Sequence, residues 1–330
     1  MSFMLALGLV SCQEPFSNDD ILFLKALPSR HDLRFEVPRE QGGGLRPAAN
    51  RRAEFHDQAK KISDGLNSGI DGVLVSLERL VTENEPTLRE DDRRVYGPFP
   101  DGDSRFLLTV TRTATETTIR PTSTSTPTEV FETYTFALVG QKLSSGDEWL
   151  PILVGRFVPT ESLSEGIGQV LVDFEAARAL GNDAHERGRF ALGYDTRDSR
   201  KDLELVIDVP DGLFGLPFAR PEAHYRFQDD GVGSVSFQFA FKTDVHEGDP
   251  TKSGIETLVI FARWRPDLFG RADVLAFEGD LPVPVLASEC WSPSLTRVFF
   301  AASIPELGAP VGTEDDCAPE HRDSAFPSGT

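Results

Sequence analysis

Residues 55–80, FHDQAKKISDGLNSGIDGVLVSLERL, determine how the rest of the chain can be arranged. Their apolar side chains recur every three or four positions, at Phe55, Ala59, Ile62, Leu66, Ile70, Val73, Leu77 and Leu80. This spacing predicts a long amphipathic α-helix with one buried face. Gly65, Gly69 and Gly72 each destabilise a helix by up to about 1 kcal/mol relative to alanine. We expect a compensating use for them, which is to let the helix approach a sheet closely. Pro86 ends the segment.

Downstream of this helix the apolar residues follow a period of two, which is typical of β-strands. In the clearest strand, polar side chains alternate with Val235, Phe237, Phe239 and Phe241. The same pattern predicts strands over residues 106–110, 132–138, 149–157, 190–194, 203–209, 225–227, 274–277 and 297–301. Residues 258–262 are apolar on both faces, so we expect a central strand covered on each side. Short turns such as Asp229-Asp230-Gly231 indicate antiparallel pairing.

Three shorter segments have patterns that need separate interpretation. Over residues 166–180 both a strand and a helix fit; we predict a strand through Phe174 and then a helical turn that ends at Gly181. Residues 33–37 alternate and predict a first strand within a leader that covers residues 13–53. The Thr-rich stretch 113–128 contains Pro121 and Pro127, which predict a loop at the tip of a hairpin.

These elements define an α+β protein that is mostly β. A broad antiparallel sheet has to bury its apolar face, and one helix covers only part of it. The sheet therefore either splits into two packed layers or curves into a barrel or half-barrel, and we favour strong curvature with the long helix on the concave side. This architecture resembles the open half-barrels of periplasmic lipoprotein carriers and related lipid-binding lipoproteins.

The N-terminus contains Leu9-Val10-Ser11-Cys12, which closes a short apolar run. It resembles the lipobox of bacterial lipoproteins, and the resemblance implies cleavage before Cys12 and a diacylglyceryl group on its sulfur. The membrane would then be a partner through acyl chains on Cys12. Gln13 in place of aspartate implies an outer-membrane lipoprotein that faces the periplasm or the cell surface. The alternative is an ordinary buried strand with a chance cysteine.

Four parts of the chain follow from these patterns. Residues 1–11 are a signal peptide, and residues 12–53 form a lipid-anchored leader. Residues 54–302 form one domain of helix and sheet, and residues 303–330 form an irregular tail. The two remaining cysteines, Cys290 and Cys317, would form a disulfide in an oxidising compartment and hold this tail to the last strands. Two buried free thiols are the alternative. A bridge of this span contributes on the order of 3 kcal/mol.

Composition restricts the classes of partner. The net charge of −20 disfavours nucleic acid, which needs clustered lysine and arginine, and anionic lipid surfaces. No run after the N-terminus approaches the roughly 20 apolar residues of a membrane-spanning helix. Phenylalanine outnumbers tyrosine by 24 to 4. Because phenylalanine has no hydrogen-bonding group, a ligand cavity in this protein would suit an apolar molecule.

The chain contains no known catalytic or cofactor motif, so we expect no catalytic residue and no cofactor. The weak metal candidates are Asp244, His246, Glu247 and Asp249, for which a solvated turn is the stronger interpretation. Asp195, Asp198 and Asp202 bracket another turn at Ser199-Arg200. We interpret His56 and His224 as exposed, and His185 and His321 as loop residues. Trp149, Trp264 and Trp291 could form a ligand platform, although core packing is the default for large aromatic residues.

Two functions remain open on these grounds. The first is a non-enzymatic, lipid-anchored envelope protein that binds or carries an apolar ligand, or holds an envelope protein at the membrane. The second is an envelope hydrolase whose Asp, Glu or His residues converge from separate strands. An open pocket lined by converging titratable groups would favour the hydrolase.

Overall fold

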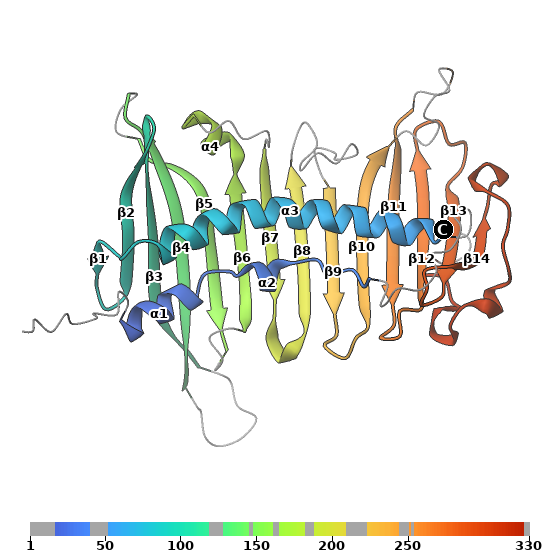
Figure 1. Cartoon of the computed structure of the whole chain (residues 1–330), viewed down its shortest axis with the longest axis horizontal. Helices are drawn as coiled ribbons and strands as arrows, with labels where there is room; N and C mark the ends of the chain where they lie inside the picture. Colours follow the sequence, from blue (N-terminus) through green and yellow to red (C-terminus); the bar gives the residue numbers. More distant parts are fainter. Residues whose placement is uncertain are drawn as a thin grey trace, which may run out of the picture.

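The computed structural model describes residues 17–39, 52–118, 128–144, 148–160, 165–181, 188–208, 223–243, 251 and 254–326. Within them the chain forms one antiparallel sheet of 14 strands, curved and unclosed, with a long helix packed across it. Figure 1 shows this helix, α3, running across the strands on one face of the sheet. The predicted fold class is confirmed, with 47% of the residues in strands.

Each strand pairs with its neighbours in sequence, so the order across the sheet is β1 to β14. The first half of the sheet consists of β1 (Leu88–Arg89), β2 (Arg93–Asp101), β3 (Ser104–Thr118), β4 (Thr128–Lys142), β5 (Leu150–Pro159), β6 (Gly166–Asp173) and β7 (Arg189–Asp195). The second half consists of β8 (Lys201–Asp208), β9 (Ala223–Asp229), β10 (Val235–Thr243), β11 (Glu256–Trp264), β12 (Gly270–Glu278), β13 (Val285–Trp291) and β14 (Arg297–Ala302).

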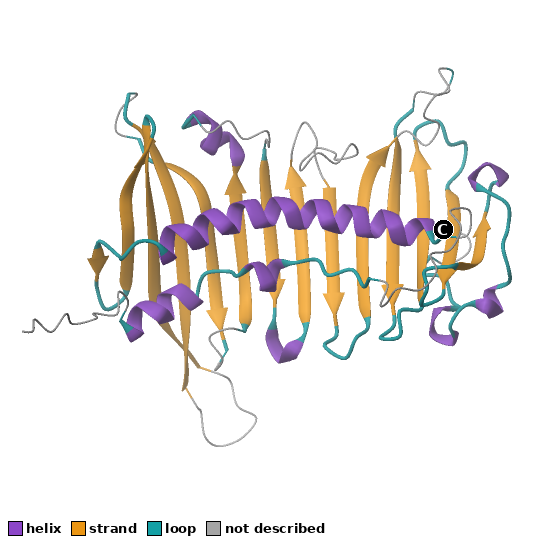
Figure 2. Cartoon of the chain, in the orientation of Figure 1, coloured by secondary structure: helices purple, strands orange, loops and turns teal. Residues whose placement is uncertain are grey.

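The helices are fewer and mostly short (Figure 2). They are α1 (Asn18–Lys25), α2 (Arg30–Leu33), α3 (Glu54–Thr82), α4 (Phe174–Ala179) and the 3-10 turns η2 (Arg197–Ser199), η4 (Pro305–Leu307), η5 (Glu314–Asp316) and η6 (Pro319–His321). The strand-then-turn prediction for residues 166–180 is confirmed by β6 and α4. No helix in the described part of the chain is long and apolar enough to span a bilayer.

The core lies between α3 and the face of the sheet that it crosses. Side chains in register on neighbouring strands form buried rows, for example Leu205 on β8, Tyr225 on β9 and Phe239 on β10. From α3 the predicted stripe supplies Ala59, Ile62, Leu66, Ile70 and Leu77. On the opposite face of the sheet, alternate side chains of the central strands point away from α3. The central strand predicted over residues 258–262 is β11, whose outward-facing Val259 and Phe261 are only partly buried.

The prediction of a first strand over residues 33–37 is wrong. Leu33 ends α2, and residues 34–39 are extended but belong to no strand. Leu33, Phe35 and Val37 are all buried, which explains the alternating pattern. The backbone of Phe35 pairs with a side chain instead of a strand: its N–H donates to Oδ1 of Asn67 at 2.8 Å, and its carbonyl accepts from Nδ2 of Asn67 at 3.0 Å. Burial therefore alternates along a segment that is not a strand. We call residues 34–39, which run beside α3 (Figure 1), the N-terminal strap.

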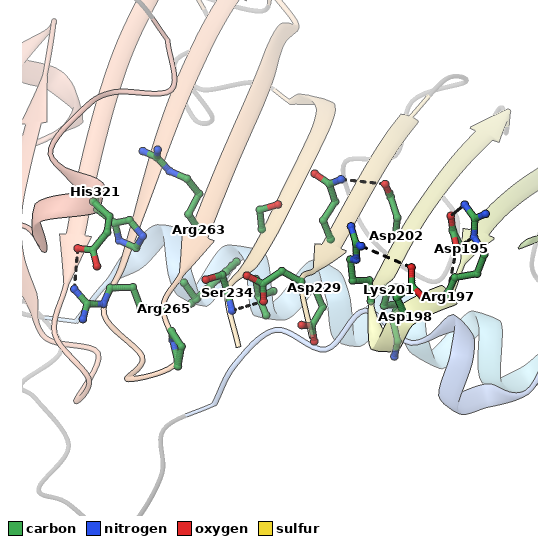
Figure 3. Close-up of a pocket in the computed structure, with 18 residues that line it drawn as sticks. Asp195, Arg197, Asp198, Lys201, Asp202, Asp229, Ser234, Arg263, Arg265 and His321 are labelled. Carbon is green, nitrogen blue, oxygen red and sulfur yellow. Dashed lines mark hydrogen bonds and ion pairs between the residues drawn. The ribbon is translucent and has the colours of Figure 1, made fainter. Parts of the chain in front are cut away.

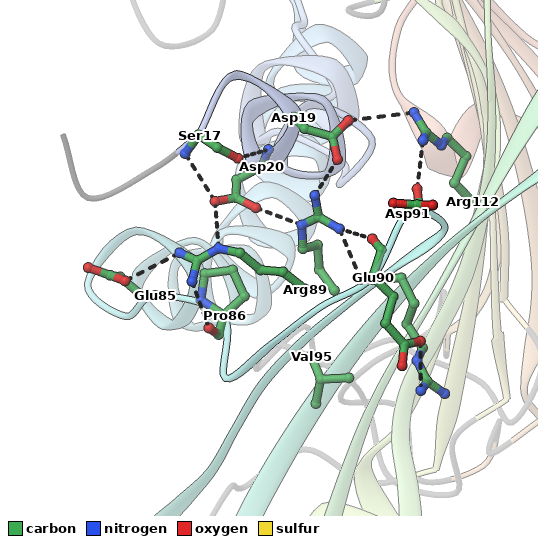
Figure 4. A network of polar contacts seen from close by, with 12 residues as sticks. Ser17, Asp19, Asp20, Glu85, Pro86, Arg89, Glu90, Asp91, Val95 and Arg112 are labelled. Carbon is green, nitrogen blue, oxygen red and sulfur yellow. Dashed lines mark hydrogen bonds and ion pairs between the residues drawn. The ribbon is translucent and has the colours of Figure 1, made fainter. Parts of the chain in front are cut away.

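A buried ion network holds α1 against the first strands (Figure 4). The Asp20 side chain is fully buried and accepts hydrogen bonds from Arg94 at 2.6 Å and from Arg89 at 3.1 Å. Burial alone would raise the pKa of Asp20, but the bonds from Arg94, the backbone of Ser17 and Arg89 outweigh it and lower the pKa to about 2. The network therefore contains an ionised carboxylate at every physiological pH.

The first turn of α3 is fixed by groups from the far end of the sheet. Glu289 on β13 is fully buried, and its two oxygens accept the backbone N–H groups of Glu54 at 3.0 Å and Phe55 at 2.8 Å. These donors have no partner within the helix, so the carboxylate satisfies them and complements the helix dipole. Arg297 donates to the same carboxylate at 2.5 Å.

The expectation that His56 faces solvent is wrong. Its ring is buried against the indoles of Trp264 and Trp291, with centroids 6.0 Å and 5.6 Å away. Its Nε2 contacts the carbonyl of Pro38 at 3.2 Å, and burial lowers its pKa. The side chain lies at α-helical spacing from Ala59 and Ser63, on the buried face of α3, and serves as a packed aromatic residue of the core.

The C-terminal segment covers the outward face of the last strands. Cys290 on β13 and Cys317 lie at disulfide distance, with sulfurs 2.08 Å apart. The side chain of Arg271 on β12 is buried and donates to Asp273 at 2.8 Å and to the carbonyl of His321 at 2.7 Å. Asp273 also accepts the N–H of Ala325 at 2.8 Å. The segment is thus attached by a bridge and by ionic hydrogen bonds.

Candidate functional site

A cleft of about 730 Å³ separates the C-terminal half of α3 from the first strands of the sheet. One wall is a flank of the helix, with Gly72, Val73, Ser76 and Leu80. The other wall comes from β2 to β6 and from α4, and it is largely apolar: Phe99, Phe106, Leu138, Ile152, Val172 and Phe174. The cleft therefore offers an elongated apolar space that is bounded by a helix on one side and by strands on the other.

The helix flank that faces the cleft includes three small residues. Gly69, Gly72 and Ser76 follow one another at helical spacing along this flank. A Cβ placed at Gly72 would meet nothing within 4 Å. The expectation that this glycine lets the helix approach the sheet closely is therefore wrong at position 72, where the missing side chain leaves open space.

The rim of the cleft is polar. Arg79, Glu83, Asn84 and Asp101 lie at the end of α3 and at the β2–β3 turn. Arg79 and Glu83 form an exposed i,i+4 ion pair at 3.5 Å, and Asn84 donates to the carbonyl of Leu80 at 2.8 Å. An apolar interior with polar groups at the opening is the usual arrangement of small-molecule sites.

A second hollow is a groove of about 850 Å³ (Figure 3). It runs along one end of strands β7 to β12, beside the turns that connect them in pairs. It extends from the β7–β8 turn to the C-terminal segment and is strongly charged, with Asp195, Arg197, Asp202, Arg263 and Arg265 among its lining residues. Several acids line this groove, so it is the candidate place for the converging acids that a hydrolase needs.

Acids of the groove are bound to neighbouring bases or to the backbone. Asp195 accepts from Arg197 at 2.6 Å, and this bond lowers the pKa of Asp195. Arg226 donates to Asp202 at 3.0 Å, and Arg265 donates to Glu320 at 2.8 Å. The lowered pKa keeps Asp195 ionised. A general acid needs the opposite, a carboxyl group whose pKa is raised.

His321 lies at the C-terminal end of the groove. It is only 6% exposed, its Nδ1 has no hydrogen-bond partner in the structure, and burial lowers its pKa to about 4. The ring is therefore neutral at pH 7. The expectation of a loop histidine holds for its place in the chain, on η6, although the side chain is buried.

The other sequence-predicted site residues are dispersed. Cys12, His185 and the weak metal candidates Asp244, His246, Glu247 and Asp249 lie outside the described residues. His224 is exposed, as expected, and contacts Glu204 at 2.8 Å. Asp195, Asp198 and Asp202 bracket the β7–β8 turn, as predicted. In the described part of the chain no group of three or more His, Cys, Asp or Glu side chains could hold a metal ion.

The three tryptophans do not form a platform. Trp264 and Trp291 pack against each other in the core, with ring centroids 5.8 Å apart. Trp149 lies at the start of β5, with the guanidinium of Arg105 over its ring at 5.3 Å. Two of the three thus follow the default of core packing.

Comparison with known proteins yields no relative. No family model matches the chain, and neither a curated protein nor a solved structure matches it. The function is therefore inferred from the residues and the geometry of this chain alone.

Sequence reasoning did not find the cleft or the carboxylate of Glu289 at the helix N-terminus. The cleft combines residues from α3 with residues up to about 100 positions later, so no local pattern marks it. A signal for Glu289 does exist: an acidic residue stands at an inward-facing position of β13, where its register neighbour on β12 is the buried Ala272.

Proposed function

We propose that the protein is a lipid-anchored envelope protein that binds an apolar or amphipathic small molecule in the cleft between α3 and strands β2 to β6. The anchor would be the acylated Cys12 of the lipobox-like N-terminus, and the binding domain would be the helix and sheet. The proposed role is non-enzymatic carriage or storage of the ligand.

The observation that carries the proposal is the cleft between α3 and strands β2 to β6, whose walls are largely apolar. Gly72 is exposed and a Cβ placed on it meets nothing within 4 Å, so no side chain of the helix closes the cleft at this position. Val73, Leu80 and Phe106 line the cleft with apolar side chains. Apolar walls on both sides make this space suitable for an acyl chain or a similar ligand.

Size and polarity agree with this assignment. Ligand pockets typically measure about 300–1,000 Å³, and a volume of 730 Å³ falls within that range. The apolar interior suits the hydrophobic part of a ligand, and the rim residues Arg79 and Glu83 suit a polar end. The charged groove, by contrast, has a lining rich in charged side chains.

The binding test uses the full chain and a fluorescent acyl probe, 11-(dansylamino)undecanoic acid. We expect Gly72→Leu to fill the cleft and weaken probe binding at least tenfold, while Gly72→Ala leaves it within about twofold. Lys61→Leu adds the same side chain at an exposed position of α3 and serves as the matched control. Equal binding by wild type and Gly72→Leu would refute the site.

A separate measurement tests the anchor. The intact mass of protein taken from its own membranes should lack residues 1–11 and include a diacylglyceryl group on Cys12. A mass that retains Met1 and a free thiol at Cys12 would refute the lipid anchor and leave the cleft proposal unaffected. Native mass spectrometry of the same sample should also show a co-purifying apolar ligand.

A further inference from the structure

The cleft between α3 and strands β2 to β6 is charged at one end only. Among the described residues that line it, the charged ones are Arg79, Glu83 and Asp101. Arg79 and Glu83 belong to the last turn of α3 and its C-cap, and Asp101 ends β2. Towards the other end the helix contributes Ser68 and Gly69, which carry no charge. We call the end with the three charged residues the polar end of the cleft, and a ligand with one polar head would place the head there.

The cleft is elongated along the helix. Its lining residues on α3 run from Ser68 to Glu83, which corresponds to about 22 Å of helix. On the sheet side they run from β2 to β6, four strand spacings or about 19 Å. The side chains between the two ends are largely apolar, with Leu80, Phe106 and Leu138 among them. This shape suits a linear alkyl chain that lies along α3, with its head at the polar end.

The polar end has an excess of negative charge. Arg79 is paired with Glu83 at 3.5 Å, so these two residues neutralise each other. Asp101 is exposed, and no base in the described part of the chain forms an ion pair with it. Arg105 on the neighbouring strand β3 points to the opposite face of the sheet, where its guanidinium lies over the ring of Trp149 at 5.3 Å. One carboxylate therefore remains without a counter-charge at this end.

The end of α3 adds to this negative potential. The backbone dipoles of a helix sum to about half a negative charge at its C-terminus, and the effect is confined to the last turn. The last turn of α3 ends at Thr82, and Figure 1 shows it beside the first strands of the sheet. Asn84 donates to the carbonyl of Leu80 there, which adds no charge. The dipole and Asp101 thus both favour a cation at the polar end.

We propose that the cleft prefers an amphiphile with one alkyl chain and a cationic amine head, with the head beside Asp101 and the end of α3. This inference rests on the cleft being the binding site, as proposed above, and adds the chemical class of the head. An ammonium group donates hydrogen bonds to a carboxylate, whereas the carboxylate of a fatty acid is repelled by it. Because Asp101 is exposed, the preference is modest and is screened by salt.

The test measures how well dodecylamine and dodecanoic acid, which have chains of the same length, displace the dansyl probe from the full chain. At low ionic strength we expect dodecylamine to displace half of the probe at about one fifth of the concentration that dodecanoic acid needs. The neutral 1-dodecanol should fall between them. Raising the salt concentration to about 0.5 M should reduce the preference for the amine to less than about twofold.

Charge variants locate the head. Asp101→Lys should reverse the order, so that dodecanoic acid displaces the probe at the lower concentration, and Asp101→Asn should reduce the preference to less than about twofold. Asp103→Lys makes the same change in charge in the same turn, at an exposed residue that is not among those lining the cleft, and should keep the wild-type order. Because both positions are exposed, the variants should retain the unfolding temperature of the parent.

Equal displacement by the two compounds at low ionic strength would overturn the inference, as would equal effects of Asp101→Lys and Asp103→Lys. Failure of the cleft itself is a different result, in which Gly72→Leu binds the probe as wild type does. If Gly72→Leu weakens probe binding and the two compounds still displace the probe equally, the cleft stands and its preference for an amine is wrong.

Discussion

The two ends of α3 meet the same sheet in different ways. At its N-terminal end, His56 packs against two indoles and Glu289 accepts the first N–H groups, so aromatic contacts and hydrogen bonds join the helix to the sheet. Near its C-terminal end, the flank around Gly72 stands away from β2 to β6 and leaves the cleft.

The difference shows how one helix can combine stability with a binding space. The packed end fixes the position of the helix by aromatic contacts and hydrogen bonds. The hollow end has other attachments: Arg30 of α2 and Arg34 of the N-terminal strap form ion pairs with Glu78 and Asp71 of α3. The Asp20 network ties α1 to β1 and β2 beside it (Figure 4). The space beside Gly72 can therefore stay open without loosening the whole helix.

The largest expected effect tests the packed end. Trp291→Ala should destabilise the protein by about 3–5 kcal/mol, because it leaves a cavity beside His56 and Trp264. Leu80→Ala, at the partly exposed wall of the cleft, should cost about 1 kcal/mol. Urea unfolding of both variants measures the contrast. Equal costs would mean that the two ends are packed alike.

The next largest effect concerns the hydrogen bonds between Glu289 and the first turn of α3. Glu289→Gln removes one of the two oxygens that accept the N–H groups of Glu54 and Phe55, and it should cost about 2–3 kcal/mol. Glu54→Gln changes an exposed partner of Arg297 and should cost less than about 0.5 kcal/mol. The free energy of unfolding of both variants decides the point, and a neutral Glu289→Gln contradicts this account.

Lowering the pH tests the ion network of Asp20, which joins α1 to the first strands. The pKa of Asp20 is lowered in the folded state, from 3.8 to about 2. The carboxylate therefore stabilises the fold above pH 4, by about 2 kcal/mol, and this stabilisation is lost as the pH falls from about 4 to about 2. Asp20→Asn should be less stable than wild type at pH 7, and the difference should shrink near pH 2.

The control for this titration is Asp19→Asn. Asp19 also contacts Arg94, but its side chain is 42% exposed, so its loss should cost much less. Unfolding curves at pH 7, 4 and 2.5 provide the comparison. A gap between wild type and Asp20→Asn that does not change with pH would exclude the ionised Asp20 as its source.

The smallest effect concerns the cleft itself. Gly72→Ala should stabilise the protein by up to about 1 kcal/mol, because alanine favours the helix and its Cβ meets open space. Gly97→Ala should do the reverse, because Gly97 has φ +102° and a Cβ there would lie 2.7 Å from the carbonyl oxygen of Phe106. Thermal unfolding distinguishes the two, and a destabilised Gly72→Ala would mean that the flank is packed.

Most of the fold could be predicted because its signals are local. The spacing of apolar residues over 55–80 places them on one helical face, and alternation such as that of Val235 to Phe241 fixes which face of a strand is buried. The same local logic failed at residues 33–37, because alternating burial does not reveal that the backbone of Phe35 pairs with Asn67.

His56 was misjudged for a different reason. It directly follows Phe55 of the apolar stripe, which suggests an exposed position, whereas its spacing to Ala59 and Ser63 places it on the buried face. The cleft was out of reach of sequence reasoning, because a glycine in a helix predicts close approach and open space equally well. Only the distance between Gly72 and strands encoded later in the chain distinguishes the two.

The sequential strand order has a consequence for how such a chain can evolve. Since every strand pairs only with the strands before and after it, a hairpin can be gained or lost without changing the order in which the other strands pair. Two added strands widen the sheet by about 10 Å, so the crossing helix would have to grow by roughly six residues to keep pace. Homologues of different width should therefore show coupled length changes in these two distant parts of the gene.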